Sequence, residues 1–270
     1  MAELRRLRDI LGGLTKATIA VSGGVDSMTL ASFAHLVLGA GRVRMVHGVS
    51  PAVPPAATDR VRAQAETEGW RLHVVDAGEF ADERYRANPV NRCFFCKSNL
   101  YETLAMMSGG VVLSGANTDD LGDYRPGLEA AAASGVRHPY VEAGLAKADV
   151  RALARRLGLP ELATLPASPC LSSRVETGIR IEADTLRLID RVEDWIREAL
   201  APETVRCRVR RIGIVLELDP ETLGRLGEAG RAALIADARR RFPGVGDTPV
   251  QLTAYERGSA FIGAGKTRVA

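Results

Sequence analysis

The chain has few cysteines and little net charge, and both shortages exclude classes of protein. Only 4 of its 270 residues are cysteine, too few for a scaffold of disulfide bonds in a chain of this length. The formal net charge is +3, so the composition does not demand a nucleic-acid partner. The first residues lack the apolar core of a signal peptide, and no apolar run is long enough to cross a membrane. We therefore expect a globular protein of the reducing cytoplasm, with no membrane partner and with thiols free for metal binding or catalysis.

Short apolar segments alternate with segments whose apolar residues recur at helical spacing. The strand-like segments are 16–21, 43–49, 72–75 and 111–114, and the helical ones are 28–38, 57–68, 98–107 and 147–157. This alternation predicts an α/β fold, with a parallel sheet that carries helices on both faces. Ligands of such folds gather beyond the carboxyl ends of the strands.

The last third of the chain has a different pattern. Residues 182–200 and 222–241 predict two long helices, and two strand-like segments lie between residues 205 and 218. We therefore expect a main domain of residues 1–178 and a smaller α+β domain of residues 179–270.

A glycine-rich hexapeptide follows the first strand-like segment. It consists of Ser22, Gly23, Gly24, Val25, Asp26 and Ser27. Adjacent glycines let backbone N–H groups approach an anion, two serines add hydroxyl donors, and the next helix adds the partial positive charge of its N-terminus. The motif lacks the lysine of a Walker loop, which argues against a kinase or GTPase. We therefore predict a site for a nucleotide pyrophosphate, with Asp26 as a magnesium ligand.

A second polar loop follows the strand-like segment 111–114, at the same expected edge of the sheet. Asp119 or Asp120 could hold magnesium, and Asn117 with Arg125 could orient a phosphate or the substrate. The alternative is that these side chains only cap their own loop. The four histidines fit ordinary positions in helices, strands and a turn, and we assign them no role.

The cysteines fall into a pair, a loop cysteine and a strand cysteine. Cys93 and Cys96 form a CxxC, typical of half a zinc site or of two half-buried thiols at a helix start. No second CxxC or close histidine pair completes a zinc site. Cys170 lies in a proline-rich segment, where Arg174 would favour the thiolate that acts as nucleophile or metal ligand. Cys207 lies in a strand-like segment and is expected to be a buried apolar side chain.

The hexapeptide resembles that of the ATP pyrophosphatase, or PP-loop, superfamily, whose members cut ATP between the α- and β-phosphates and adenylate a substrate. Further segments are similar to those of the LarE family within it. They are Asn88-Pro89 with Arg92-Cys93-Phe94-Phe95-Cys96-Lys97, the stretch that begins Gly115-Ala116-Asn117-Thr118-Asp119-Asp120, and Pro169-Cys170-Leu171-Ser172-Ser173-Arg174. The resemblance extends from the hexapeptide to about residue 217.

The resemblance implies an ATP-dependent sulfur transferase of nickel-pincer nucleotide cofactor synthesis. A carboxylate of a pyridinium dicarboxylate mononucleotide would attack the α-phosphate of ATP, which forms an acyl-adenylate and releases pyrophosphate. A sulfur nucleophile would then displace AMP and leave a thiocarboxylate. Asp26, Cys170 and Arg174 are the expected catalytic residues, with ATP and Mg²⁺ bound at the hexapeptide. Family members also suggest a homo-oligomer.

The family obtains its sulfur in two ways. In one branch, the cysteine that matches Cys170 gives up its own sulfur and becomes dehydroalanine. In the other, three thiolates hold a [4Fe-4S] cluster whose open iron binds an extra sulfide. Cys93, Cys96 and Cys170 match the three ligands. Because the chain has the CxxC in addition to the loop cysteine, we expect the cluster branch, with sulfide or another sulfur donor as partner.

The resemblance also suggests contacts with the substrate. Arg208 and Arg210 match the family's Arg-x-Arg, and arginines alternating along one strand face can bind a phosphate group bidentately. Glu217 resembles a downstream acidic residue, although the connection from Arg210 is shorter than the family leads us to expect. Ser173 and Arg174 complete the expected set. The alternative for the arginines is a solvated strand edge.

Three other functions compete at this level. A PP-loop tRNA thiolase also pairs adenylation with cysteine chemistry, but it needs a basic face that the near-balanced charge does not favour. An amide-forming synthetase of the superfamily would leave the cysteines unexplained. A nucleotide-binding module without catalysis belongs to a different class, and the intact hexapeptide together with Cys170 argues against it.

Overall fold

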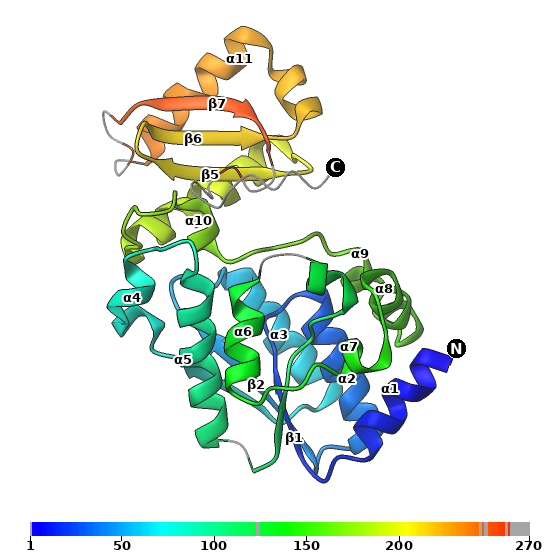
Figure 1. Cartoon of the computed structure of the whole chain (residues 1–270). Coiled ribbons are helices and arrows are strands. Elements are labelled where there is room, and N and C mark those ends of the chain that lie inside the picture. Colours follow the sequence, from blue (N-terminus) through cyan, green and yellow to red (C-terminus); the bar gives the residue numbers. More distant parts are fainter. Residues whose placement is uncertain are drawn as a thin grey trace. The chain divides into compact units, whose positions relative to one another are not determined.

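A computed structural model describes residues 2–107, 109–122, 125–242, 245, 248–256 and 259. The chain forms two compact units (Figure 1). The first comprises Met1–Asp82 and Asn91–Ser168, and the second comprises Glu83–Val90 and Pro169–Ala270. The chain therefore passes from one unit to the other three times. The division into domains 1–178 and 179–270 stays a prediction.

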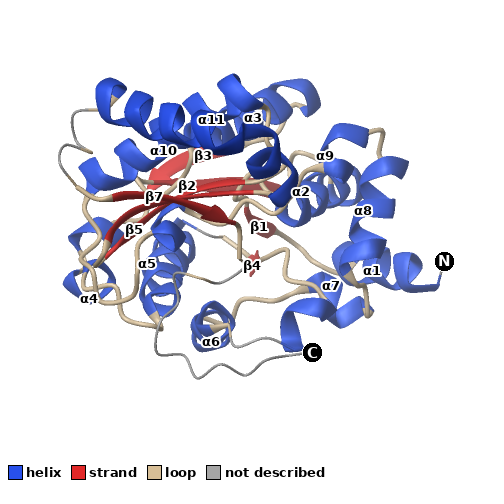
Figure 2. Ribbon diagram, turned by 90° about the horizontal axis from the view of Figure 1, so that it is seen from above, coloured by secondary structure: helices blue, strands red, loops and turns tan. Residues whose placement is uncertain are grey.

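The first unit is built on a parallel sheet of four strands in the order β3-β2-β1-β4. The strands are β1 (Ala17–Ala20), β2 (Val43–Val49), β3 (Leu72–Asp76) and β4 (Val111–Leu113). Ala17 of β1 pairs with Val43 of β2 and with Val111 of β4, so both neighbours run parallel to the central strand. The predicted α/β fold is confirmed, and Figure 2 shows strands lying among the helices.

Helices and short 3₁₀ turns connect these strands. The helices are α1 (Ala2–Gly12), α2 (Val25–Leu38), α3 (Pro55–Glu68), α5 (Arg92–Met107), α6 (Pro126–Ala133), α7 (Pro139–Ala143), α8 (Lys147–Arg156) and α9 (Pro160–Thr164), and the 3₁₀ turns are η1 (Glu79–Ala81) and η2 (Thr118–Gly122). The helix expected from residue 98 begins at Arg92, which puts the CxxC on the helix itself. No helix in the described part of the chain is long and apolar enough to span a membrane.

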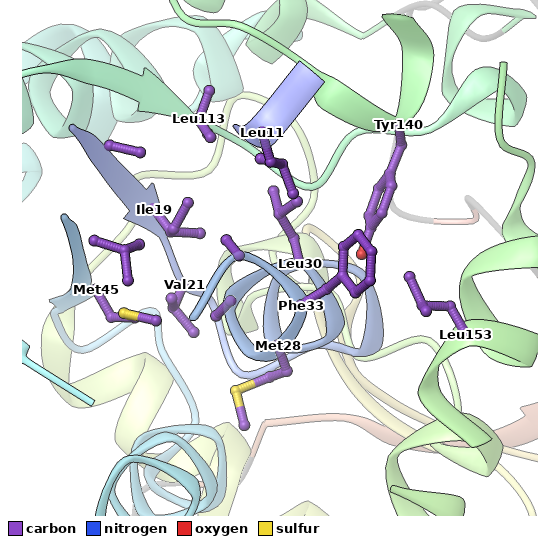
Figure 3. Packing of buried hydrophobic residues seen from close by; sticks show 14 of the residues in the cluster. Leu11, Ile19, Val21, Met28, Leu30, Phe33, Met45, Leu113, Tyr140 and Leu153 are labelled. Atoms are coloured by element: carbon purple, nitrogen blue, oxygen red, sulfur yellow. The ribbon is translucent and has the colours of Figure 1, made fainter. Parts of the chain in front are cut away.

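Side chains on the two faces of the sheet join two different apolar clusters. In β2, Met45 packs in a cluster with Leu30 of α2 and Leu153 of α8, part of which Figure 3 shows. The next residue, Val46, points to the opposite face, where it packs with Leu104 of α5. This alternation is the two-residue period of a strand covered on both faces. Each fully buried leucine contributes about 1.5–3 kcal/mol to folding, and the two clusters hold β1 and its following loop in a fixed place.

The second unit contains a mixed sheet of three strands in the order β5-β6-β7. Its elements are α4 (Glu83–Arg86), η3 (Leu171–Arg174), α10 (Ala183–Leu200), β5 (Val205–Arg210), β6 (Gly213–Leu218), α11 (Pro220–Arg241) and β7 (Val250–Ala254). β5 and β6 pair antiparallel, and β6 and β7 pair parallel. The expected small α+β architecture is therefore present, and β7 adds a strand that the sequence pattern did not indicate.

Asn88 is one of the residues that attach the segment Glu83–Val90 to the second unit. The Asn88 amide nitrogen donates to the carbonyl oxygens of Glu176 and Ile179 at 2.9 and 2.8 Å. Asn88 is fully buried and has a φ of 54°, a left-handed conformation in which asparagine is among the best tolerated residues. The backbone N–H of Gly178 in turn donates to the Asn88 carbonyl. These bonds explain why eight residues from the first half of the chain belong to the later unit.

Candidate functional site

The glycine-rich hexapeptide forms the turn between β1 and α2, at the carboxyl end of the central strand. Gly23 has a φ of 80°, which side chains other than glycine rarely adopt. A Cβ at this position would lie 2.7 Å from the carbonyl oxygen of Ala57 in α3. Glycine is therefore required here both by backbone conformation and by the close approach of α3. The loop opens at the N-terminus of α2, where backbone N–H groups favour an anion.

The two serines of the hexapeptide tie the turn to itself. The backbone N–H of Ser22 donates to the Ser27 hydroxyl oxygen at 3.0 Å. The Ser27 hydroxyl donates to the Gly24 carbonyl at 3.3 Å, and the two hydroxyl oxygens lie 3.0 Å apart. Because the Ser27 hydroxyl uses its one proton in the bond to the Gly24 carbonyl, it must accept the hydrogen bond that the Ser22 hydroxyl donates. The network holds the turn in one conformation and leaves both lone pairs of the Ser22 oxygen for other donors.

Arg60 of α3 fixes the orientation of one peptide bond in the loop. Its guanidinium donates to the Gly23 carbonyl oxygen at 2.8 Å. In a trans peptide, the carbonyl and the following N–H point in opposite directions. Because Arg60 holds the carbonyl of Gly23, the N–H of Gly24 is directed to the opposite side of the loop.

His47 of β2 supports the start of the loop from the sheet. It is fully buried, and its Nδ1 lies 2.7 Å from the Val21 carbonyl oxygen while its Nε2 lies 2.9 Å from the Thr58 hydroxyl. A carbonyl can only accept, so Nδ1 carries the proton and Nε2 accepts from Thr58. Burial lowers the pKa of His47, which favours this neutral form. His47 thus has a positioning role that we did not assign from the sequence.

Asp26 stands in the first turn of α2 and has two side-chain partners. Its Oδ2 lies 2.5 Å from Nζ of Lys147, the first residue of α8, and its Oδ1 accepts from the Asn117 amide at 3.3 Å. A Cβ at Gly115 would lie 2.8 Å from the Asp26 carbonyl carbon. The loop after β4 is therefore pressed against the hexapeptide, and Asn117 and Asp26 come together as expected for one site.

Several polar residues of the loop after β4 also bind one another. The Asn117 backbone N–H donates to Asp120 at 3.0 Å, and the Asp119 N–H donates to the Asn117 side-chain oxygen at 3.1 Å. Arg125 forms an ion pair with Asp120 at 2.9 Å. These are the loop-capping contacts that were one of the two sequence interpretations. Each carboxylate still has further lone pairs, so capping and ligand binding are compatible.

Cys93 and Cys96 lie in the first turns of α5, and both are half buried. Residues three apart on a helix share a face, so the two thiols are neighbours on α5. Cys93 and Cys96 belong to the first unit and Cys170 to the second. Among the described residues, no three or more histidine, cysteine, aspartate or glutamate side chains are gathered as a metal site.

Cys170 immediately precedes η3 and is exposed. The adjacent loop is fixed by Arg174, whose side chain is only 2% exposed. Arg174 forms a double hydrogen bond with fully buried Glu193 of α10, at 2.9 and 3.0 Å, and also donates to the Cys170 carbonyl at 3.2 Å. Burial disfavours the charge of Arg174, but Glu193 outweighs it and raises the pKa of Arg174, and a Cys170 thiolate raises it further. Arg174 therefore anchors the loop that presents Cys170.

Cys207 is buried, whereas Cys170 is exposed. It is 1% exposed within β5, and burial, with the nearby Glu193 charge, raises the pKa of its thiol far above the ordinary value. A buried, protonated thiol is neither a good nucleophile nor a good ligand. The expectation of a buried apolar side chain is confirmed.

The expected substrate residues of the second unit come together on the β5-β6 sheet. Arg208 and Arg210 both bind the Glu217 carboxylate, at 2.9 and 2.7 Å. Arg208 also donates to the Ser173 carbonyl at 2.9 Å. Glu217 and Arg208 are almost completely buried, at 2% and 4% exposed. The shorter connection between Arg210 and Glu217 does not separate them, because the β5-β6 hairpin returns Glu217 to the arginines.

The structure adds four residues that the sequence analysis missed: Lys147, Arg60, His47 and Glu193. Each contacts a segment distant in sequence, so no local motif marks it. The one available signal was the position of Lys147 at the start of a helix after a polar loop, but a lysine at a helix start is too common to single out.

A parallel sheet flanked by helices, with a glycine turn after β1 and an acidic residue in the first turn of α2, is a Rossmann-type α/β fold and is consistent with the PP-loop class. No model of a protein family matches the chain. An uncharacterized protein of Synechocystis is 40% identical over 226 residues, which cover 82% of this chain and 83% of the relative.

A second relative has an assigned activity. The pyridinium-3,5-bisthiocarboxylic acid mononucleotide synthase of Lactiplantibacillus plantarum is 31% identical over 218 residues, or 79% of this chain and 78% of the synthase. An uncharacterized protein of Methanocaldococcus jannaschii is 25% identical over 210 residues, or 76% of this chain and 79% of the relative. The chain therefore belongs to the LarE family, to which the synthase belongs.

Proposed function

We propose that the protein is an ATP-dependent sulfur transferase of nickel-pincer nucleotide cofactor synthesis. Its substrate is a pyridinium dicarboxylate mononucleotide, and its product carries thiocarboxylates in place of carboxylates. The observation that supports this most is the exposed Cys170 on a loop anchored by Arg174, in a chain that also has a nucleotide loop and resembles a thiocarboxylate synthase over most of its length.

The first stage is adenylation of a carboxylate. The hexapeptide holds the phosphates of ATP through its N–H groups, and through the hydroxyls of Ser22 and Ser27 once these exchange their bonds within the loop for bonds to phosphate. Arg60 keeps the Gly24 N–H in place. Asp26 suits Mg²⁺ because its carboxylate is a hard oxygen ligand and its side chain is 27% exposed. Bound Mg²⁺ would neutralise phosphate charge. Asn117, Asp119, Asp120 and Arg125 complete the nucleotide side of the site.

The second stage is delivery of sulfur to the adenylate. Cys93, Cys96 and Cys170 are thiols with some exposure, and three thiolates are a suitable donor set for a [4Fe-4S] cluster. Such a cluster would supply an open iron for an extra sulfide. In the second candidate route, Cys170 itself gives up its sulfur. Both routes need Cys170 accessible, as it is on its loop.

The substrate phosphate is assigned to the second unit. Arg210, whose side chain is 21% exposed, would offer its guanidinium to the phosphate, while the almost completely buried Arg208 supports it through their shared partner Glu217. Glu217, Ser173 and Arg174 set the positions of these groups and of the Cys170 loop. We further propose that the protein acts in the cytoplasm as a homo-oligomer, with residues 179–270 serving substrate binding and assembly.

Pyrophosphate release with the pyridinium dicarboxylate mononucleotide tests the adenylation stage. We expect pyrophosphate release by the wild type and by Cys170→Ala, and thiocarboxylate formation by the wild type but not by Cys170→Ala. Asp26→Asn should lose pyrophosphate release. Cys207→Ala is the matched control and should retain both activities. ATP binding without pyrophosphate release in the wild type would instead support a binding module, and salt-sensitive affinity for tRNA would support a tRNA thiolase.

Anaerobic purification with iron and sulfide analysis distinguishes the sulfur sources. We expect a chromophore and bound iron in the wild type, and loss of both in Cys93→Ser and Cys170→Ala. An iron-free protein that loses the mass of one hydrogen sulfide at Cys170 after a single turnover would contradict the cluster and establish the sacrificial route.

A further inference from the structure

The nucleotide loop has no lysine of its own, yet a lysine ammonium group lies at it. Nζ of Lys147 is 2.5 Å from Asp26 Oδ2, although the two residues are 121 positions apart. The Lys147 side chain is 34% exposed, so it reaches the loop from an open position and not from the core. In Walker loops, a lysine inside the motif contacts the β- and γ-phosphates. Here a lysine from α8 comes to an equivalent place through the fold.

Lys147 is held at this place by its backbone as well as by its side chain. Its N–H lies 3.3 Å from Asp119 Oδ2, to which it donates. The N–H of Thr118 donates to the Leu145 carbonyl at 3.0 Å, which ties the same loop to the segment before α8. The side chain itself has a flexible four-carbon stem, so its ammonium can change partners while its backbone stays in place.

The partner of Lys147 in this structure is Asp26, which is also the proposed magnesium ligand. Asp26 binds Lys147 through Oδ2 and Asn117 through Oδ1. If Asp26 ligates Mg²⁺ when ATP binds, the metal's positive charge competes with the ammonium for this carboxylate and weakens the bond between Asp26 and Lys147. The released ammonium then lies beside a loop that holds polyphosphate. The carboxylates of Asp119 and Asp120 already accept hydrogen bonds from backbone N–H groups and Arg125, whereas a bound polyphosphate would bring new negative charge, so phosphate is the favoured new partner.

We propose that Lys147 is the cation that binds the β- and γ-phosphates of ATP and the pyrophosphate that leaves. In the free protein Asp26 keeps the ammonium at the loop, and nucleotide binding transfers it from carboxylate to phosphate. Lys147 thereby stabilises the negative charge that grows on the leaving pyrophosphate. This assignment rests on the proposed binding of ATP at the hexapeptide.

Calorimetric titration of the full chain with Mg·ATP, AMP and inorganic pyrophosphate tests the assignment. Lys147→Met should weaken ATP and pyrophosphate binding about 10- to 100-fold, the range of a hydrogen bond to a charged group, and should leave AMP binding unchanged. Lys147→Arg keeps the charge and should recover part of the loss. Lys16→Met is the matched control, because Lys16 is exposed and lies outside the site.

A second background separates phosphate binding from a purely structural ion pair. In Asp26→Asn, Lys147 has already lost its carboxylate, so removing the ammonium leaves no unpaired Asp26 and the fold is less affected. Phosphate binding predicts that Lys147→Met still weakens metal-free ATP binding about 10-fold or more in this background. If the ion pair is purely structural, Lys147→Met causes no further loss of ATP affinity in this background, and that result would overturn the assignment.

The outcomes also separate this assignment from the proposed function. If the wild type binds ATP but releases no pyrophosphate with the dicarboxylate, the proposed sulfur-transferase function is wrong. The role of Lys147 is then still decided by comparing the ratio of ATP affinity to AMP affinity in Lys147→Met with that in the wild type. If the wild type forms the thiocarboxylate and Lys147→Met keeps that ratio, only the Lys147 assignment fails. A wild type that binds no ATP overturns both.

Discussion

Gly23 is the residue on which the nucleotide loop depends most directly. Its positive φ and the nearness of Ala57 leave no space for a side chain. Forcing a side chain into this conformation costs about 1–3 kcal/mol, and the clash with a backbone oxygen of α3 must also be relieved by movement of the loop. Both effects act on the segment that is expected to hold the phosphates.

Gly23→Ala should therefore weaken ATP binding at least about 10-fold and lower the free energy of unfolding by about 1–3 kcal/mol. Calorimetric titration and urea unfolding measure the two effects. Gly12→Ala serves as the control, because a Cβ at Gly12 meets nothing within 4 Å. Equal ATP affinity in Gly23→Ala and the wild type would show that the loop does not bind phosphate in this conformation.

The four thiols should also differ in their reaction with iodoacetamide. In the folded apoprotein, Cys170 should react first because it is exposed, and Cys93 and Cys96 more slowly because they are half buried. Cys207 should react only after denaturation, since burial raises its pKa and excludes the reagent. Peptide mapping by mass spectrometry gives the order. Labelling of Cys207 at the rate of Cys170 in folded protein would disprove this ranking.

Local sequence was sufficient to predict that the hexapeptide is a turn between a strand and a helix, because its glycines, serines and helix start are contiguous. It was insufficient for Lys147, Arg60 and His47, whose contacts with the loop region join residues 121, 37 and 26 positions apart. Such contacts depend on the register of the sheet and the packing of α3 and α8. For His47 the missing information was which carbonyl its ring would face.

At the level of elements, η3 depends on α10 through a single buried ion pair. Arg174 and Glu193 are 2% and 0% exposed, and Glu193 also accepts from the Cys207 backbone N–H at 3.0 Å. Removing one partner of a buried pair leaves an uncompensated charge and costs about 3–5 kcal/mol. The pair therefore joins the cysteine loop, α10 and β5 into one structure.

Glu193→Ala should destabilise the protein by about 3–5 kcal/mol in urea unfolding. The control is Glu221→Ala, which removes an exposed i,i+4 pair with Arg225 and should cost less than about 1 kcal/mol. Similar losses of unfolding free energy in both variants would show that the buried Arg174–Glu193 pair stabilises the protein no more than an exposed pair does.

The attachment of the nucleotide loop to β2 should depend on pH through His47. Burial lowers its pKa below the ordinary 6.5, so below that pH the unfolded chain takes up a proton that the folded chain does not. Stability should fall as pH decreases from 6.5, by at most about 1.4 kcal/mol per pH unit from this group. In His47→Gln, urea unfolding at pH values above and below 6.5 should show a smaller decrease. If the stability of His47→Gln falls with pH as much as that of the wild type, His47 is not the source of the pH dependence.

Periodicity located the strands of the first sheet well because buried parallel strands are short apolar runs. It placed the start of α5 at residue 98 and not at Arg92, although a helix start at the CxxC was one of the interpretations of that motif. β7 was missed because its partly exposed residues carry no strong alternation. Its place in the sheet comes from pairing with β6.

For the molecule as a whole, the main feature is that the second unit uses residues from two separated parts of the chain. Glu83–Val90 packs with Pro169–Ala270, and Asn88 supplies buried hydrogen bonds to Glu176 and Ile179. The sequence pattern suggested a simple division because patterns along the chain do not show which distant segments pair.

Asn88→Ala should loosen the second unit and leave the first unchanged. The variant loses the side-chain donor to buried carbonyls and places alanine at a φ of 54°. Amide hydrogen exchange should increase in peptides from η3 to β6 and not in those from β1 and α2. Asn99→Ala, which removes bonds to Asp82 and Phe95 within the first unit, should give the reverse pattern. An equal increase in both regions would contradict the assignment of this segment.

The interrupted course of the chain also restricts how the family could have evolved. A gene rearrangement at one boundary can exchange a domain only when that domain is contiguous. Here a cut at Pro169 would carry away most of the second unit but leave Glu83–Val90 behind, and with it the Asn88 bonds. The two units are therefore expected to be inherited together, so the second unit should change by point substitution and not by replacement.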